Sequence, residues 1–282
     1  MSACFVMQQS ASVHMMVDSL AYERGGRVVM VNLSKGHALP TLGAAISAIG
    51  PAALSRHLAD RIAYDFSSFD DLIRDGEAYI AEQFDFLAEE SRSGNANGTM
   101  FLIGWHRETG LPGSYSMDMW TDDSDRAQQV TENSGFSKAY AESVRGKLIK
   151  QPADQINGSP MPSPQLADEA GFRIHNSNDR YVPEIDLLHL MEIARHERIE
   201  DAHWVGGKAV LTSISKDGLS QRVVEHWQGD QIGEFVAPDP IDWKAWRAAR
   251  SVEAAGVNLD GMSRLQRERM EKKARKGTLR AV

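Results

Sequence analysis

The sequence contains one cysteine, Cys4, among its 282 residues. A single cysteine cannot form an intrachain disulfide, so nothing in the sequence calls for an oxidising compartment. The sequence also lacks a run of 18 apolar residues, and its first residues lack the basic-then-apolar order of a secretory signal. We therefore expect a cytoplasmic location, or assembly into a particle in the cytoplasm, without contact with membranes.

Positive charge is in deficit, with 31 Lys and Arg against 39 Asp and Glu and a net charge of −8. This balance excludes a protein that binds nucleic acid over its whole surface. The basic tail, residues 264–280, is the exception: it holds eight Lys and Arg against Glu268 and Glu271. Two interpretations stay open, contact with an acidic protein neighbour and neutralisation of nucleic-acid phosphates. We favour the protein contact because no aromatic side chain interleaves the charges.

Patterns for metals and cofactors are also missing. The nine histidines do not have the spacing of a metal site, although His189 and His196 can share one helix face. The glycine pair before Lys208 lacks the spacing of a phosphate-binding loop. We therefore predict no metal and no cofactor.

What the sequence does contain is a regular alternation of short β-like runs and turns over its first fifty residues. Turn signals stand at Gln9-Ser10-Ala11 and at Gly25-Gly26. Between and around them the pattern predicts strands over residues 2–8, 12–17 and 27–33 and a fourth within 38–49.

The later sequence groups its elements in blocks. Helical spacing of apolar residues predicts helices over 51–64, from Ser68 to about 87, and over 183–198, with strands over 99–105, 114–120, 205–214 and 221–227. Residues 121–182 form a loop-rich insert, with a short helix within 137–148 and an extended loop over 151–164. Further helices are expected at 242–255 and 263–277. Such blocks favour layered α+β packing over a βαβ repeat.

Four residues occupy particular positions in this pattern of strands and turns. Ser2 follows the initiator, Asp18 ends the second strand, Lys35 lies on the next hairpin, and Gly50 precedes the first long helix. The arrangement resembles the N-terminal nucleophile (Ntn) hydrolases of the proteasome β-subunit type. The resemblance implies a four-layer αββα sandwich over residues 1–237, followed by a helical, basic C-terminal extension over 238–282.

The resemblance also implies a chemistry, hydrolysis of an amide or peptide bond by Ser2 once Met1 has been removed. The α-amine of Ser2, with an ordinary pKa of about 7.7–8.0, takes the Oγ proton as Oγ attacks the carbonyl. Lys35 lowers the pKa of the amine and Asp18 orients Lys35, while the Gly50 N–H donates to the oxyanion.

Other interpretations stay open. Ser commonly follows an initiator Met, Asp18 also suits a turn, and Lys35 also suits a solvated loop. Cys4 is expected to be a small buried residue, and as a nucleophile it would need processing after Ala3. Ser134-Gly135 is a candidate for the Ser-Gly segment that the family places in its active site. The alternative function is a catalytically inactive structural or assembly protein, for example in a phage-like particle. Either function implies a homo-oligomer or larger assembly.

Overall fold

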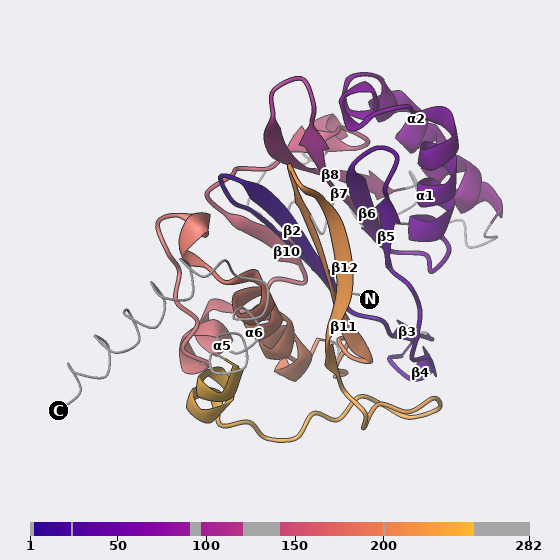
Figure 1. Cartoon of the computed structure of the whole chain (residues 1–282). Coiled ribbons are helices and arrows are strands. Elements are labelled where there is room, and N and C mark those ends of the chain that lie inside the picture. Colours follow the sequence, from indigo (N-terminus) through magenta and orange to yellow (C-terminus); the bar gives the residue numbers. More distant parts are fainter. Residues whose placement is uncertain (1–2, 24, 91–96, 121–141, 200, 251–282) are drawn as a thin grey trace, which may run out of the picture. The chain divides into compact units, whose positions relative to one another are not determined.

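The computed structural model describes residues 3–23, 25–90, 97–120, 142–199 and 201–250 (Figure 1). The chain divides into two compact units, Met1–Asp239 and Pro240–Val282. In the second unit residues 243–250 are helical, within the predicted helix 242–255. The basic tail and the helix expected over 263–277 lie outside the described residues.

The first unit is a mixed α/β fold built on antiparallel sheets, as the grouping of elements predicted. One five-stranded sheet has the order β10-β1-β2-β11-β12. Its strands are β1 (Cys4–Gln8), β2 (Ser12–Val17), β10 (Ile156–Ser159), β11 (Lys208–Ser215) and β12 (Gly218–His226). Because β1 and β2 form a hairpin, the start of β1 and the end of β2 lie side by side, with Cys4 opposite Val17.

The second five-stranded sheet has the order β5-β6-β7-β8-β9. It consists of β5 (Gly36–Leu39), β6 (Ala44–Ile49), β7 (Asn97–His106), β8 (Leu111–Trp120) and β9 (Ile149–Lys150). A separate small hairpin joins β3 (Ala21–Tyr22) and β4 (Val28–Met30). The β7–β8 hairpin is continuous over its whole length, with Tyr115 opposite Lys150 where β9 joins it.

The inner faces of the two sheets share one buried cluster. Val6 and Met15 from the first sheet pack with Phe101 and Ile103 from the second. Alternate residues of each strand point to this cluster, as the period of two in a strand requires. Burial of these side chains holds the two sheets together.

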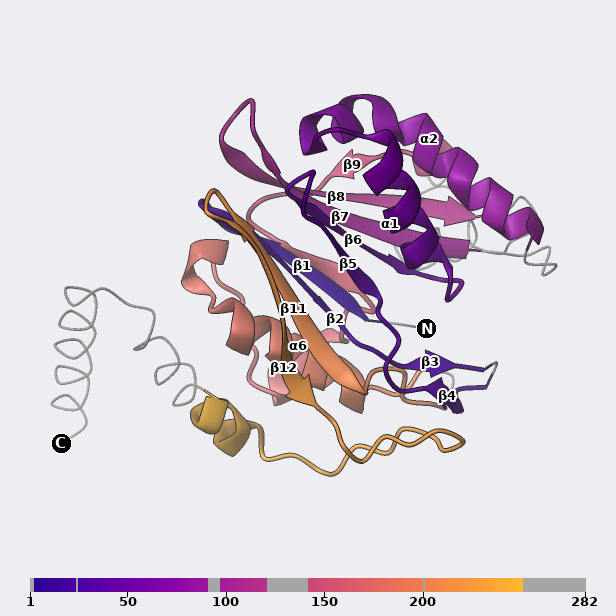
Figure 2. The same cartoon turned by 45° about the vertical axis from the view of Figure 1, so that its right-hand side comes forward.

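Helices α1 (Leu54–Asp65) and α2 (Phe69–Glu90) pack on the other face of the second sheet (Figure 2). Their apolar faces, including Leu58 and Phe84, join Met100 and Met117 of the sheet in a separate buried cluster. The Ser68 hydroxyl accepts a 3.1 Å hydrogen bond from the Asp71 N–H, so Ser68 caps α2 as predicted.

Helix α6 (Pro183–His196) packs against β1 and β2 of the first sheet (Figure 2). Pro183 occupies the first turn, where its missing N–H costs nothing. The Asp186 carboxylate accepts a 2.6 Å hydrogen bond from the N–H of Val182, the residue just before the helix. Shorter helical segments, α5 (Pro164–Glu169) and η1 (Asn178–Arg180), precede it.

Two sequence-based expectations need correction. The extended loop predicted over 151–164 contains strand β10, which pairs with β1. The strand predicted over 27–33 is reduced to β4. The fourth strand predicted within 38–49 is present as β6, and β5 is a further strand that pairs with it. Of the short helix expected within 137–148, residues 142–144 are helical and 137–141 lie outside the described residues.

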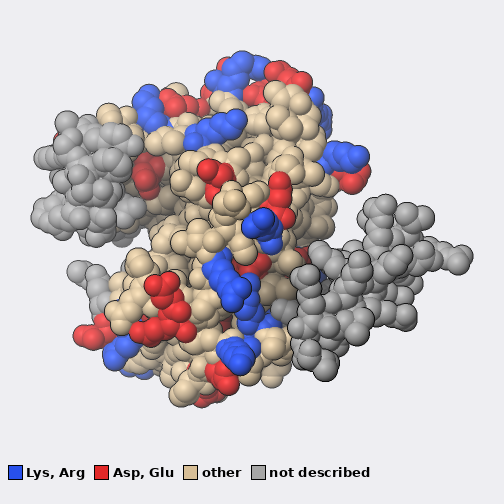
Figure 3. All heavy atoms as spheres, turned by 90° about the vertical axis from the view of Figure 1, so that its left-hand side faces the viewer, with Lys and Arg blue, Asp and Glu red and all other residues tan. Residues whose placement is uncertain are grey.

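The surface of the described residues carries both signs of charge. On the face in Figure 3, basic and acidic side chains are interspersed, so no single sign covers it. No helix within the described residues is long and apolar enough to cross a membrane.

Candidate active site

The hairpin β1–β2 brings the start of the described chain against Asp18. The Ala3 N–H donates a 2.9 Å hydrogen bond to Asp18 Oδ1, and the Asp18 N–H donates to the Ala3 carbonyl at 3.2 Å. The Leu20 N–H donates to Asp18 Oδ2 at 3.2 Å. Asp18 is completely buried, so backbone donors supply part of the solvation that its carboxylate has lost.

Lys35 completes this arrangement from the second sheet. It directly precedes β5, and its Nζ lies 2.6 Å from Asp18 Oδ1. The Lys35 side chain is only 4% exposed, so the two residues form a buried ion pair. The structure therefore brings together two of the four residues that the sequence analysis selected. An ion pair this deep costs desolvation energy, so its presence is weak evidence that it stabilises the fold.

The surroundings of the pair shift the pKa of neighbouring groups. Burial lowers the pKa of the Lys35 ammonium, and the charge of Asp18 together with its hydrogen bond opposes this shift. Burial raises the pKa of the Cys4 thiol, against a hydrogen bond from Ser47. Cys4 is fully buried and stays a neutral thiol, which matches its expected place as a small buried residue rather than a nucleophile.

Gly50 and Lys35 lie at the same end of the second sheet, where β5 begins and β6 ends. Gly36, which follows Lys35, pairs with Ser47, and Gly50 is three residues beyond Ser47 at the end of β6. Its φ of 136° and a Cβ position only 2.5 Å from the Asn97 carbonyl oxygen require glycine there. Among the described residues no contact of Gly50 with the Asp18–Lys35 pair is recorded.

The corner after β2 also contains Ser19, which follows Asp18 and forms with it the Asp-Ser pair of the family resemblance. The Ser19 hydroxyl donates to the Val31 carbonyl at 2.8 Å and accepts from the Lys208 N–H at 2.9 Å. Its side chain therefore joins three segments and is structural. The order of residues along the chain cannot reveal this role, because Lys208 lies 189 residues away.

A second buried ion pair backs this corner. Arg195 of α6 binds Asp230 through both guanidinium nitrogens, at 2.9 and 2.7 Å, and Asp230 also accepts a 2.7 Å hydrogen bond from the Gly207 N–H. The Tyr22 hydroxyl is buried without a hydrogen-bond partner within the described chain. Burial raises the pKa of Tyr22, and the negative charges of Asp18 and Asp230 act in the same direction.

Ser2 and Ser134-Gly135 lie outside the described residues. The covalent link from Ser2 is nevertheless to the Ala3 nitrogen, the atom that donates to Asp18. Within the ranges that the structure describes, no group of three or more His, Cys, Asp or Glu side chains is arranged to hold a metal ion.

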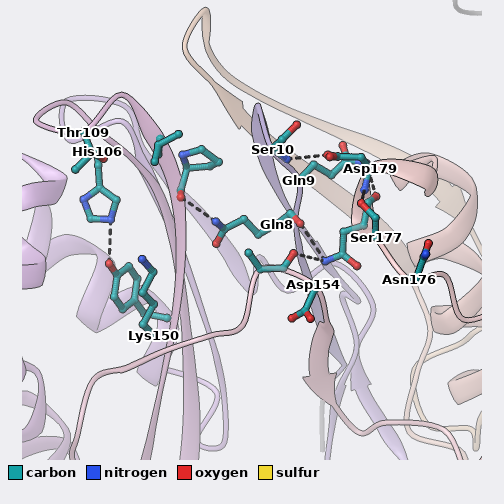
Figure 4. A pocket seen from close by; sticks show the side chains of 15 residues that line it. Gln8, Gln9, Ser10, His106, Thr109, Lys150, Asp154, Asn176, Ser177 and Asp179 are labelled. Atoms are coloured by element: carbon teal, nitrogen blue, oxygen red, sulfur yellow. Dashed lines mark hydrogen bonds between the residues drawn. The ribbon is translucent and has the colours of Figure 1, made fainter.

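A cavity of about 640 Å³ lies at the opposite end of β1, away from the Asp18–Lys35 pair (Figure 4). We call it the distal cavity. It is lined by Gln8, Gln9 and Ser10, by His106, Thr109, Leu111, Pro112 and Tyr115, by Lys150, Ala153 and Asp154, and by residues 176–179. Cys4 and Gln8 are the two ends of a five-residue strand, so about 14 Å of sheet separate the cavity from the ion pair.

Comparison with protein-family models finds no match for this chain, and comparison with curated proteins finds none either.

Proposed function

We propose that this protein is an Ntn-type hydrolase of amide or peptide bonds that uses Ser2 as its nucleophile after removal of Met1. The observation that carries the proposal is the buried Asp18–Lys35 pair, whose shared oxygen also accepts a hydrogen bond from the Ala3 nitrogen. This nitrogen is bonded to the carbonyl carbon of Ser2, so the residue that carries the proposed nucleophile is linked directly to an atom held at the pair.

The chemistry follows from the charges. With Met1 removed, the Ser2 α-amine in its neutral form takes the Oγ proton as Oγ attacks the substrate carbonyl. The Lys35 ammonium lowers the pKa of that amine and stabilises negative charge in the transition state. Asp18 fixes the position of Lys35 through the 2.6 Å contact. The Gly50 N–H is the proposed donor to the oxyanion.

The proposed fold is the four-layer αββα sandwich of this superfamily over residues 1–237, with a helical extension over 238–282. Support comes from the buried cluster shared by two antiparallel sheets and from the packing of α1 and α2 on one sheet and of α6 on the other. A mixed fold of this kind occurs with many activities, so the functional proposal depends on the site and not on the layers.

The first test is the intact mass of the purified full chain with N-terminal sequencing. We expect loss of the mass of one methionine and Ser as the first residue. A peptide epoxyketone, which bonds to both the hydroxyl and the α-amine of an N-terminal nucleophile, should then add once per chain. A uniformly retained Met1, or a blocked Ser2, would refute the proposal because the α-amine base would be missing.

A matched pair of variants separates catalysis from folding. Ser2→Ala should abolish both epoxyketone labelling and hydrolysis of a fluorogenic peptide library. Ser220→Ala, a change of the same size at an exposed position of strand β12, should leave both unchanged. Full hydrolysis by Ser2→Ala would show that another residue is the nucleophile.

A second candidate function is that of a catalytically inactive assembly protein with this fold. It is favoured by large apolar side chains that are exposed on the helical layer, Tyr64 of α1 at 87% and Phe86 of α2 at 49%. The proposed partners are further copies of the chain, with the basic tail contacting protein. Sedimentation analysis of the wild type and of a Tyr64→Ser/Phe86→Ser variant tests this, since a monomeric wild type would exclude it.

A further inference from the structure

One wall of the distal cavity carries a chain of hydrogen bonds that starts on helix α2. Asp70 Oδ1 lies 2.7 Å from His106 Nδ1. His106 Nε2 lies 2.9 Å from the Tyr115 hydroxyl, a hydrogen bond that Figure 4 marks with a dashed line. When Nδ1 donates to Asp70, the neutral imidazole has only Nε2 left as an acceptor, so the Tyr115 hydroxyl donates to it. The phenol oxygen keeps its lone pairs for another donor at the cavity.

Lys150 extends this wall. It is the residue directly opposite Tyr115 on strand β9, so both side chains lie on the same face of the sheet. Figure 4 shows the Lys150 side chain beside the ring whose hydroxyl is joined to His106 by a dashed line, which is Tyr115. No ion pair of Lys150 occurs among residues 3–23, 25–90, 97–120, 142–199 and 201–250. Lys150 is exposed, so the cavity wall presents an ammonium group that has no ion-pair partner within the described part of the chain.

The other side of the cavity presents acceptors. Asn178 is buried, and its Nδ2 donates to the carbonyls of Gln8, Ala153 and Gln155 at 3.0 to 3.1 Å. Its Oδ1 is buried without a hydrogen-bond partner. Asp154, nearby in the same lining, forms no ion pair within the described part of the chain. In Figure 4 Asp154 lies toward β1, on a different side of the view from Lys150.

We propose that the distal cavity binds a small zwitterion, an α-amino acid or a short unblocked peptide. Its carboxylate contacts Lys150, and its ammonium contacts Asp154. Opposite charges that line one cavity without pairing leave each available to a ligand. A ligand with only a carboxylate would face the charge of Asp154 without compensation, and a cationic ligand would meet Lys150 in the same way. A volume of about 640 Å³ lies in the ordinary range of small-molecule sites.

This proposal goes beyond the hydrolase and does not depend on it. The cavity lies at the other end of β1 from the Asp18–Lys35 pair, and none of its lining residues belongs to the proposed catalytic set. The test is therefore made in the Ser2→Ala variant of the full chain, where hydrolysis by Ser2 is removed but the cavity is intact. A failure of the hydrolase proposal leaves this result interpretable.

The probes are triglycine, N-acetyltriglycine and triglycine amide. Their binding to the protein is measured by ¹H–¹⁵N NMR titration. They share one backbone and differ only in which terminal charge is present at neutral pH. We expect triglycine to bind up to about fivefold more tightly than either blocked peptide, because each lost contact is an ion pair at an exposed side chain. Equal binding of all three peptides, or no binding of triglycine at its solubility limit, would overturn the proposal.

Variants locate the binding. Lys150→Met and Asp154→Asn should each weaken triglycine binding by up to about fivefold, whereas Lys150→Arg keeps the charge and should retain most of the binding. Asp85→Asn, at an exposed position of α2 far along the chain from the cavity lining, is the matched control and should have no effect. Binding that is unchanged in both Lys150→Met and Asp154→Asn would place the ligand elsewhere and refute the assignment.

Discussion

Replacing Lys35 with Met should destabilise the protein by far more than the loss of an ordinary lysine. Met has a similar length, but it leaves the completely buried Asp18 carboxylate without its counter-charge. Among the described residues, the N–H groups of Ala3 and Leu20 then remain as its hydrogen-bond donors. Removing one partner of a buried ion pair costs about 3–5 kcal/mol. For a domain of this size that is a fall in Tm of roughly 6–20 °C.

The assay is urea unfolding of full-length protein, followed by tryptophan fluorescence and circular dichroism. Lys147→Met is the control, because Lys147 forms an exposed ion pair with Glu77 at 2.8 Å, and such pairs contribute about 1 kcal/mol at most. The double variant Asp18→Asn/Lys35→Met removes both charges. It should recover a large part of the loss, since the uncompensated charge causes most of the cost.

The reasoning fails if Lys35→Met is no less stable than Lys147→Met. It also fails if the double variant is destabilised by the sum of its two single variants, because additive losses mean that the two charges do not interact. The m-value should stay unchanged in the single variants, so that a change in midpoint reports stability alone.

Three further predictions concern other parts of the first unit. Burial lowers the pKa of His14 to about 4, below the value of about 6.5 in an unfolded chain, so the unfolded state binds the proton first. The contribution of His14 to the free energy of unfolding should therefore be fully present above about pH 6.5 and fall by up to roughly 3 kcal/mol towards pH 4. In a series of unfolding curves at different pH, His14→Gln should reduce the dependence of stability on pH over this range. An unchanged dependence would contradict the assignment to His14. Gly50→Ala should cost about 1–3 kcal/mol by urea unfolding, because a Cβ would lie 2.5 Å from a carbonyl oxygen at a φ of 136°. Gly110→Ala, at a φ of 67° with no atom within 4 Å of the added Cβ, should cost less. Equal costs would show that the close approach of Cβ to the carbonyl oxygen at Gly50 does not contribute. Asn178→Ala should lower the free energy of unfolding by about 2–4 kcal/mol in the same assay, because three carbonyl groups lose their hydrogen-bond donor. A smaller decrease would mean that water replaces the amide as the donor.

The local pattern of the sequence predicts several elements closely. Strand β2 (Ser12–Val17) has the predicted bounds, and the cap of α2 is the predicted Ser68. Both features depend on neighbouring residues, the alternation of apolar side chains in one and a hydroxyl before a helix in the other. Strand β10 is missed because its four residues stand among prolines, and only its pairing with β1 makes it a strand.

Some residues of the candidate site could likewise be predicted from the sequence, and others could not. Asp18 and Lys35 could be selected because each occupies a recognisable position in a strand frame, and they prove to be in contact. Tyr22, Asp230 and Ser47 could not be selected, because their place near the site depends on the packing of distant segments. The distal cavity is the extreme case, since four separate stretches of the chain line it and none has a motif.

Cys4 gives this molecule a chemical property that is useful in experiments. It is the only thiol in the chain, it is fully buried on the strand next to Asp18, and its pKa is raised. A thiol reagent can modify it only when the strand pair β1–β2 separates from its neighbours. The rate of labelling therefore reports how often this end of the sheet opens, without any engineered probe. Cysteines introduced at exposed positions can be labelled selectively, because the native thiol reacts only during opening.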